Sequence, residues 1–381
     1  MRIRTLTIAM LATAAAMTAC NSGSKNHSSD EWVIENDVWN FENIDLEEIA
    51  DIVDIKPIKS DEPIDELRLY MSGNSNDFII GDSYHRQTFY HVVNGQVTEK
   101  LHTPGNGPTE YNYLDCFSYL PADSLLYGFD RRGRIMCFKT SPFKFVSYYP
   151  TDYKVNDMIA LGRNRLLITA MTPSRDSCAI YEFDGETMTK LTDMNGFGRM
   201  YMFPSYSRSG DDLIVTTIHE YVTAYQYNEG QMQKVATFDN GDMELTKDKQ
   251  YEIDLGNGYT AITFKDFAIA CYNAQFDGST LAYWYKAVLN QHEYRHLAIA
   301  TRDSVHNYEV HIGGLITMAR AGMIDNGVYT MLIQGDWEGK INPDEELSAT
   351  GKRIIEALKN NNDGNPIYMQ FRLKDKYLNK N

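Results

Sequence analysis

Residues 125–130 read Leu-Leu-Tyr-Gly-Phe-Asp, an apolar run that ends at a turn and precedes a second run rich in apolar and aromatic residues. Short runs of this kind are typical of buried β-strands, because aromatic and branched side chains pack well on a pleated surface. The unit recurs along the chain. One residue near the middle of each copy serves as its marker: Ile80, Leu126, Leu167, Ile214, Ala282 and Tyr329.

The spacing of these markers indicates the architecture. The steps between them are 46, 41, 47, 68 and 47 residues, and four of the five lie near the ~40–50 residues of a four-stranded propeller blade. A small sheet cannot bury both of its faces alone, whereas sheets arranged radially bury them against each other. We therefore predict an all-β, six-bladed β-propeller of four-stranded antiparallel blades. A seventh blade within the long step is the alternative, and the polar stretch 242–254 predicts an exposed loop or an extra hairpin.

Turn residues and the two ends of the chain complete this prediction. Asn-Gly and Asp-Gly pairs between the runs predict hairpins whose two central residues both have positive φ. They are Asn94-Gly95, Asp184-Gly185, Asp277-Gly278 and Asn326-Gly327. The alternating patterns of residues 46–59 and 366–373 predict that the N- and C-terminal strands share a blade and close the ring. A short helix is expected within residues 348–361, with an apolar face of Ile354, Ile355 and Leu358.

The N-terminus has the order of a secretory signal. Arg2 and Arg4 precede an uncharged stretch, residues 5–19, which is too short for a membrane-spanning helix. The small residues before Cys20 resemble a bacterial lipobox, although Met17 stands where Leu is usual. We predict a signal peptide at 1–19, lipid attachment at Cys20, a flexible tether at 20–31 and a single propeller domain at 32–381. Asn21 favours the outer membrane, on its periplasmic face or at the cell surface.

The net charge and the cysteines of the chain restrict the kinds of partner and cofactor that it can bind. The chain has 36 Lys and Arg against 52 Asp and Glu, a net charge of −16. Such a protein is repelled by phosphate backbones, so nucleic acid is not an expected partner. Besides Cys20, the cysteines are Cys116, Cys137, Cys178 and Cys271, without a C-x-x-C pair. They predict small buried side chains, although an oxidising compartment would permit disulfides and the spacing identifies no pair. No cofactor is expected.

Two motifs carry a family resemblance. Residues 105–111, Gly-Asn-Gly-Pro-Thr-Glu-Tyr, are similar to a G-x-G-P-x-E-Y segment, and residues 365–374 resemble a closing strand. With the blade pattern, residues 32–376 resemble bacterial lipoproteins with six-bladed, TolB-like propellers, common in relatives of Bacteroides. The resemblance implies a propeller scaffold and an envelope location, without an agreed reaction or catalytic residues.

A possible metal motif lies late in the chain. Residues 292–296 read His-Glu-Tyr-Arg-His, and on a helix His292 and His296 would share a face for zinc with Glu293 as general base. The apolar spacing of residues 281–296 fits a helix, but it also fits two strands, 281–288 and 297–301, with the motif in the turn between them. Zinc hydrolysis, adventitious metal binding and a structural role all stay open.

The other candidate is a basic cluster in an acidic chain. Arg131, Arg132 and Arg134 could grip a carboxylate or an anionic sugar, or form a solvated turn. The Gly-rich segment before it lacks the Lys and Ser or Thr of a phosphate loop, so we predict a tight connection between blades with Glu110 or Tyr111 packed beneath it.

The sequence favours a binding function. We expect a membrane-anchored envelope lipoprotein whose propeller is a binding or scaffold module for a glycan or a protein partner, and not an enzyme. The alternative is an envelope enzyme, either a carbohydrate-active propeller or the zinc hydrolase of residues 292–296. A hydrolytic propeller should place acids, His and Arg together at one mouth of its channel.

Overall fold

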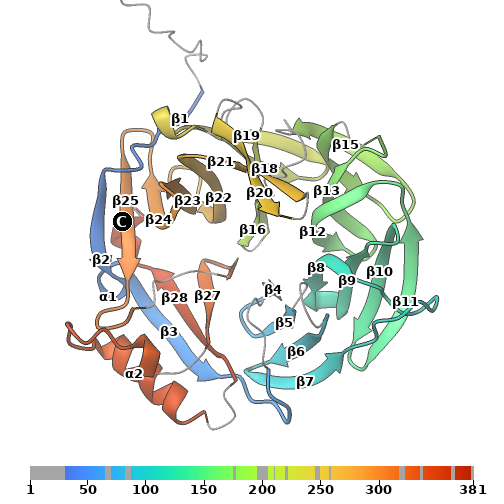
Figure 1. Ribbon diagram of the computed structural model, residues 1–381, viewed down its shortest axis with the longest axis horizontal. Helices are drawn as coiled ribbons and strands as arrows, with labels where there is room; N and C mark the ends of the chain where they lie inside the picture. The colour runs from blue at the N-terminus through green and yellow to red at the C-terminus, as the bar shows by residue number, and fades with distance from the viewer. Residues whose placement is uncertain are drawn as a thin grey trace, which may run out of the picture.

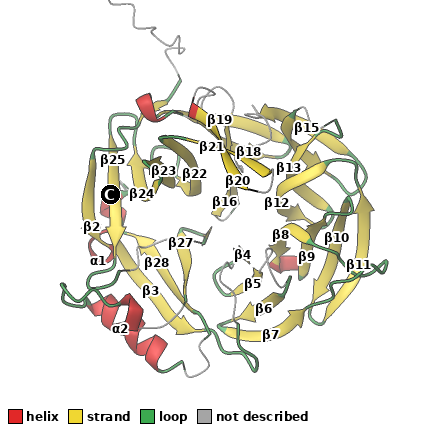
Figure 2. Ribbon diagram, viewed as in Figure 1, coloured by secondary structure: helices red, strands yellow, loops and turns green. Residues whose placement is uncertain are grey.

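The computed structural model describes residues 31–64, 70–81, 87–174, 177–194, 205–209, 211–218, 222–244, 249–256, 259–316, 322–334, 338–361 and 365–378. Six sheets surround a central axis as the blades of a propeller (Figure 1). Figure 2 shows the ring built of strands, with a helix outside it at one blade. The predicted six-bladed, all-β fold with mostly antiparallel, four-stranded blades is confirmed.

The first three blades each contain four consecutive strands, from the innermost to the outermost. Blade 1 comprises β4 (Tyr70–Gly73), β5 (Asp77–Gly81), β6 (Phe89–Val93) and β7 (Gln96–Leu101). Blade 2 comprises β8 (Leu114–Leu120), β9 (Leu125–Asp130), β10 (Arg134–Thr140) and β11 (Phe143–Pro150). Blade 3 comprises β12 (Lys154–Gly162), β13 (Arg165–Met171), β14 (Cys178–Phe183) and β15 (Met188–Met194).

The last three blades all include strands from the N-terminal segment. Blade 4 comprises β16 (Ser205–Ser209), β17 (Asp212–Ile218), β18 (Val222–Asn228), β19 (Gln231–Asp239) and β1 (Val33–Glu35). Blade 5 comprises β22 (Phe267–Phe276), β23 (Leu281–Leu289), β24 (His292–Ala300), β25 (Val305–His311) and β2 (Phe41–Asp45). Blade 6 comprises β26 (Met323–Asp325), β27 (Val328–Ile333), β28 (Ile367–Leu373) and β3 (Ala50–Pro57).

The six markers all lie on the second strand of their blade, which is buried on both faces. Successive residues of such a strand point to opposite faces. Tyr127 packs into the core between blades 2 and 3, whereas its neighbour Leu126 packs into the core between blades 1 and 2. The described part of the chain forms six hydrophobic clusters in all, one between each pair of adjacent blades. Radial packing therefore buries what no single sheet could bury.

The ring closes as predicted, through antiparallel pairing of the C-terminal β28 with the N-terminal β3. The two other N-terminal strands add to the outer edges of neighbouring blades in parallel. β1 pairs with β19 and β2 pairs with β25, so that the segment before β3 runs along the rim (Figure 1). Glu31, at the end of the predicted tether, contacts Thr237 through a 2.8 Å hydrogen bond and pairs with Lys234.

The long step between the fourth and fifth markers contains a two-stranded hairpin, β20 (Gln250–Gly256) and β21 (Tyr259–Phe264). This finding agrees with the expected extra hairpin and replaces the alternative of a seventh blade. The turns also differ in detail from the prediction. Both residues have positive φ at Asn94-Gly95 and at Asn326-Gly327, whereas at Asp184-Gly185 and Asp277-Gly278 only the glycine does. In these two turns the Asp side chain accepts hydrogen bonds from the following N–H groups instead.

The predicted C-terminal helix is α2 (Ala349–Lys359), whose buried residues include Ile354, Ile355 and Leu358. It begins at Ser348, whose side chain accepts a 3.1 Å hydrogen bond from the N–H of Gly351. The helix packs outside β3, near the short helix α1 (Leu46–Ile49) (Figure 1). No helix in the described ranges is long and apolar enough to cross a bilayer.

The two ends of the propeller differ in what they carry. Because strands alternate in direction within a blade, links from second to third strands and from one blade to the next meet at one end, which we call the loop end. The links of this kind include segments 102–113 and 131–133, the hairpin of β20 and β21, and the helix α2. The other end carries mainly short turns, such as 94–95 and 326–327. Each innermost strand therefore begins at the loop end.

Candidate functional site

A cavity of about 410 Å³ lies on the propeller axis. It is bounded by the innermost strands of blades 1 to 4, along β4, the middle of β8 and the middle of β12, and at Tyr206 of β16. Its lining combines three tyrosines, two carboxylates, an amide, a thiol, two hydroxyls and apolar side chains. The residues are Tyr70, Met71, Ser72, Tyr113, Asp115, Cys116, Phe117, Ser118, Asn156, Asp157, Met158, Ile159 and Tyr206.

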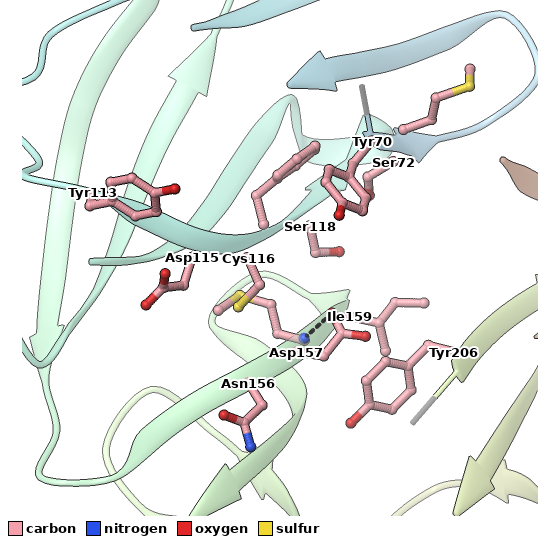
Figure 3. Close-up of a pocket in the computed structure, with 13 residues that line it drawn as sticks. Tyr70, Ser72, Tyr113, Asp115, Cys116, Ser118, Asn156, Asp157, Ile159 and Tyr206 are labelled. Atoms are coloured by element: carbon pink, nitrogen blue, oxygen red, sulfur yellow. Dashed lines mark hydrogen bonds between the residues drawn. The ribbon is translucent and has the colours of Figure 1, made fainter. Parts of the chain in front are cut away.

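Figure 3 shows how these side chains surround the cavity. Asp157 lies near its centre, with Tyr206 on one side and Cys116 on the other. Tyr113 and Asp115 form the wall that blade 2 contributes, and Tyr70, which is 52% exposed, comes from blade 1. Mixed aromatic and polar linings of this size are typical of sites that bind small ligands.

The cavity wall is held together by hydrogen bonds between adjacent innermost strands. The Ser72 hydroxyl accepts from the N–H of Tyr119 at 2.9 Å, which joins β4 to β8. The Ser118 hydroxyl accepts from the N–H of Ala160 at 2.9 Å, which joins β8 to β12. Arg208 of β16 donates to the carbonyl of Ala160 at 2.6 Å and joins β16 to β12. The four strands that bound the cavity are therefore linked in sequence, and the site is preorganised.

Asp157 is a half-buried carboxylate without a countercharge. Its side chain accepts a 2.8 Å hydrogen bond from the N–H of Met158, and within the described ranges it forms no ion pair. Burial raises the pKa of Asp157 to about 7, and the single N–H donor offsets this only in part. Near neutral pH this carboxyl group can therefore both hold and release a proton.

The groups around Asp157 stay protonated. Burial raises the pKa of the Cys116 thiol well above its usual value, and the charges of Asp157 and Asp115 add to this effect. Burial and the charge of Asp157 likewise raise the pKa of the Tyr206 hydroxyl. A thiol of this kind is a poor nucleophile, because the thiolate is the reactive form. Cys116 is therefore a small side chain of the cavity wall, and Asp157 is the group that can exchange a proton near neutral pH.

Asp115 differs from Asp157 because it has a cationic partner. Arg131 donates to the Asp115 carboxylate at 2.7 Å, and its guanidinium carbon lies 3.8 Å from the ring centroid of Tyr113. One of the three predicted arginines thus stands behind the cavity wall, stacked on one lining residue and paired with another. It is 57% exposed at its side chain, so water screens much of this pairing.

The other two arginines are engaged within the protein. Arg132 and Arg134 pair with the fully buried Asp130 at 2.8 and 2.6 Å, and both donate to the carbonyl of Glu110. Burial pushes the pKa of Asp130 upward, but hydrogen bonds from Arg134 and Arg132 outweigh it and hold that pKa below its usual value. The arginines of the basic cluster thus bind groups of blade 2 and of the preceding loop and do not form an open anion site.

That preceding loop is the Gly-Asn-Gly-Pro-Thr-Glu-Tyr segment. The Glu110 carboxylate folds back to accept a 2.7 Å hydrogen bond from the N–H of Gly107, and a Cβ at Gly105 would lie 2.1 Å from it. Tyr111 is fully buried, and its hydroxyl donates to the carbonyl of Gln87 at 2.5 Å. The segment is therefore the tight connection between blades that the sequence predicts, with Tyr111 packed beneath.

The His-Glu-Tyr-Arg-His motif lies on strand β24, not on a helix. The turn that precedes it is Asn290-Gln291, so the motif follows the hairpin turn rather than forming it. On a strand, residues four positions apart are separated by about 13 Å. His292 is exposed, whereas His296 is buried and its Nδ1 lies 3.0 Å from the hydroxyl of Tyr285. The two imidazoles therefore do not converge.

The remaining groups of the motif also have structural partners. Glu293 pairs with Lys286 at 2.6 Å and with Arg295. His296 packs against the ring of Phe41, with centroids 4.4 Å apart, and burial lowers the pKa of His296 to about 4. In the described part of the chain, no group of three His, Cys, Asp or Glu side chains is placed to hold a metal ion. The helical arrangement on which the zinc hypothesis rests is wrong.

The structure thus brings together residues that the sequence did not single out. Tyr206 lies about fifty residues after the adjacent pair Asn156-Asp157 and meets it only in the folded ring. A weak signal existed in the serines of the innermost strands, since Ser72 and Ser118 each stand eight positions before a marker. The predicted signal peptide, Cys20 and most of the tether lie outside the described residues.

Comparison with known proteins extends the fold assignment. No protein-family model matches the chain, and no curated protein matches its sequence. Among solved structures, a Bacteroides fragilis protein described as exported is similar over 90% of this chain and 99% of its own, with a TM-score of 0.64 and 13% identity. A DUF4221-family member from Bacteroides vulgatus has a TM-score of 0.43, with 6% identity over 86% of this chain and 98% of its own. BamB from Moraxella catarrhalis has a TM-score of 0.37, with 10% identity over 86% of this chain and 98% of its own. At such identity the first match establishes a shared propeller fold.

Proposed function

We propose that this protein is a lipid-anchored binding module of the cell envelope, with the axial cavity as its ligand site. The observation that carries the proposal is the cavity itself, lined by Tyr70, Tyr113 and Tyr206 together with Asp115, Asn156 and Asp157. Aromatic faces combined with carboxylate and amide groups suit small polar ligands such as a glycan unit. The linked innermost strands keep this lining in place before a ligand arrives.

The envelope location is supported by the N-terminal sequence and by the described export of the Bacteroides fragilis protein with the same fold. The signal-like residues 1–19 precede Cys20, and the following stretch is polar and small. We infer attachment of lipid at Cys20 and an outer-membrane position, with either a periplasmic or a surface orientation. A protein or glycan partner would then meet the propeller outside the cytoplasm.

The anchor is tested by expressing the full chain with its own leader in a Gram-negative host. We expect the wild-type protein to partition into the detergent phase of a Triton X-114 separation and Cys20→Ala to partition into the aqueous phase. Mass spectrometry should find acylation at residue 20. An unacylated, cleaved product from the wild-type gene would contradict the lipoprotein proposal.

Ligand binding in the cavity is tested by capture from fractionated envelope glycans and peptides. Asn156→Trp places a large side chain in the cavity, and Val146→Trp on the exposed outer strand β11 is the matched control. We expect the wild-type protein and Val146→Trp to retain the same ligand fraction and Asn156→Trp to lose it. Equal retention by both variants would show that binding occurs elsewhere.

An enzymatic role is the second candidate, and Asp157 favours it. A carboxyl group whose pKa is about 7 is suited to general acid or base catalysis at neutral pH. The lining also contains a second acid, Asp115, with Arg131 behind it, but none of the thirteen lining residues is a histidine. Hydrolysis of a captured glycan that disappears in Asp157→Asn would establish this role. Unchanged ligand after prolonged incubation would support the binding module.

A further inference from the structure

We propose that the axial cavity recognises a primary ammonium group, which Asp157 binds as counter-ion within a ring of tyrosines. This inference rests on the proposed function, because it names the ligand class for the same cavity. On this proposal anions do not bind in the cavity, and neutral polar molecules bind more weakly than ammonium compounds. The argument uses the charge balance of the lining, the arrangement of its aromatic rings and the hydrogen-bonding groups beside Asp157.

The described lining of the cavity carries more negative than positive charge. Among its thirteen described residues are two carboxylates and no Lys, Arg or His. Arg131 compensates Asp115 at 2.7 Å, whereas Asp157 receives only one backbone N–H within the described ranges. A desolvated carboxylate without a countercharge is costly. A cation that enters the cavity would supply that countercharge, while an anion would add to the repulsion.

The aromatic lining favours an organic cation. Tyr206 and Asp157 interact electrostatically, and Figure 3 shows the Tyr206 ring close to Asp157. Tyr70 and Tyr113 complete the aromatic side of the lining. The faces of aromatic rings attract ammonium groups, more strongly where water is excluded. Arg131 already stacks on Tyr113 at 3.8 Å from the wall side, which shows that a ring of this lining accepts a cation.

Hydrogen-bonding groups select a primary amine over a quaternary one. The Asp157 carboxylate and the side-chain oxygen of Asn156 are acceptors for N–H donors, and both lie in the lining. An ammonium with three N–H groups can use several acceptors, whereas a quaternary ammonium can use none. The volume of about 410 Å³ suits a molecule the size of an amino sugar or a short alkyl amine.

Proton linkage gives the proposal a second readout. An ammonium group binds the charged form of Asp157, so affinity should rise as the pH rises through the pKa of that group, about 7. The other titratable side chains of the described lining are Tyr70, Tyr113, Asp115, Cys116 and Tyr206, and Cys178 lies next to Asn156. Burial keeps Cys116, Cys178 and Tyr206 protonated near neutral pH. Within the described ranges, Arg131 contacts the wall at Asp115, and Arg208 contacts it at the carbonyl of Ala160.

The test uses three probes of equal length: pentylamine, 1-pentanol and pentanoate. Their binding to the full mature chain is measured by titration calorimetry at pH 6, 7 and 8. We expect pentylamine to bind at least tenfold more tightly than 1-pentanol at pH 8, and pentanoate not to bind. The affinity for pentylamine should fall about tenfold from pH 8 to pH 6, because an alkyl amine stays charged while Asp157 takes up a proton.

Variants assign the effect to Asp157. Asp157→Asn keeps the size of the side chain and should remove the preference for pentylamine and its pH dependence. Asp193→Asn, an exposed residue of the same blade, should change neither. Equal affinity for pentylamine and 1-pentanol, with both lost in Asn156→Trp, would overturn the ammonium assignment and leave cavity binding intact. Absence of pentylamine binding at pH 8 would also overturn it, while envelope capture decides the proposed function separately.

Discussion

Asp130 and Asp157 are aspartates of adjacent blades with opposite surroundings. Asp130 ends β9, is fully buried and receives Arg132 and Arg134 at 2.8 and 2.6 Å. Asp157 lies on β12 beside the axial cavity and has a single backbone donor. The pKa of the first lies below its usual value, whereas burial raises the pKa of the second to about 7. The comparison teaches that the arginine cluster, which stands out in the sequence, is paired within the protein. Asp157, which forms no ion pair with a described residue, lines the candidate site.

Removal of Asp130 should have the largest effect. Asp130→Ala leaves two arginines facing a buried site without their shared carboxylate, and loss of one partner of a buried ion pair costs about 3–5 kcal/mol. We expect urea denaturation at pH 7 to show a loss of that size in the free energy of unfolding. Asp157→Asn is the control and should not destabilise the protein. A loss below 1 kcal/mol in Asp130→Ala would mean that the junction is dispensable.

His296 gives the next effect and must be separated from Asp157, since both titrate in the same range. The folded protein holds His296 neutral down to about pH 4, whereas the unfolded chain protonates it near pH 6.5. Its contribution to stability is therefore present above pH 6.5 and lost as the pH falls toward 4. We expect His296→Phe to remove about 3 kcal/mol of this pH dependence, as measured by chemical denaturation from pH 4 to pH 7.5. An unchanged profile would place this imidazole in contact with water.

Asp157 should give a smaller slope of opposite sign. In the folded protein the carboxyl group of Asp157 keeps its proton up to about pH 7, whereas in the unfolded chain it loses the proton near pH 3.8. The contribution of Asp157 to stability therefore falls as the pH rises between these two values. Each unit of pKa shift corresponds to about 1.4 kcal/mol, and solvent in the cavity screens part of the burial. In the His296→Phe background, Asp157→Asn should therefore gain on the order of 2 kcal/mol relative to its parent between pH 4 and pH 8. An identical pH profile in both proteins would show that the carboxylate is well solvated.

Arg131→Ala should have the smallest effect on stability. The side chain is 57% exposed, and an ion pair of this kind contributes at most about 1 kcal/mol. Loss of the Arg131 side chain would leave the carboxylate of Asp115 without its cationic partner. We therefore expect thermal unfolding to be almost unchanged and the affinity of the cavity for pentylamine to rise a few fold. A decrease in that affinity would mean that Arg131 positions Tyr113 for the ligand.

Most of the architecture could be predicted because each blade contains a short apolar stretch that can be recognised in the sequence. The second strand of each blade is buried on both faces, so Leu126 and its counterparts stand in continuous apolar runs that recur at blade spacing. Ring closure could be predicted from the alternating residues at both ends. The added strands β1 and β2 could not, because parallel pairing at a sheet edge has no turn that links the partners and no required residue.

The site resisted prediction for a related reason. Asp157 is one of 52 acidic residues, and nothing next to it in the sequence distinguishes it. What sets it apart is the lack of an ion pair with any described residue and the meeting of β12 with β8 and β16, which depend on contacts between blades. The arginine cluster, in contrast, stands out in the sequence, while the groups that bind it include the backbone carbonyl of Glu110, more than twenty residues earlier.

The route of the N-terminal segment has a mechanical consequence. A force applied to the chain before Glu31 reaches β1 first, then β2, and only after both of them β3, which forms the seam of the ring. The pairings of β1 and β2 must therefore break before a pulling force can act on the pairing of β3 with β28 that closes the ring. A pulling force on this end of the chain would therefore detach the rim strands of blades 4 and 5 before it could open the propeller.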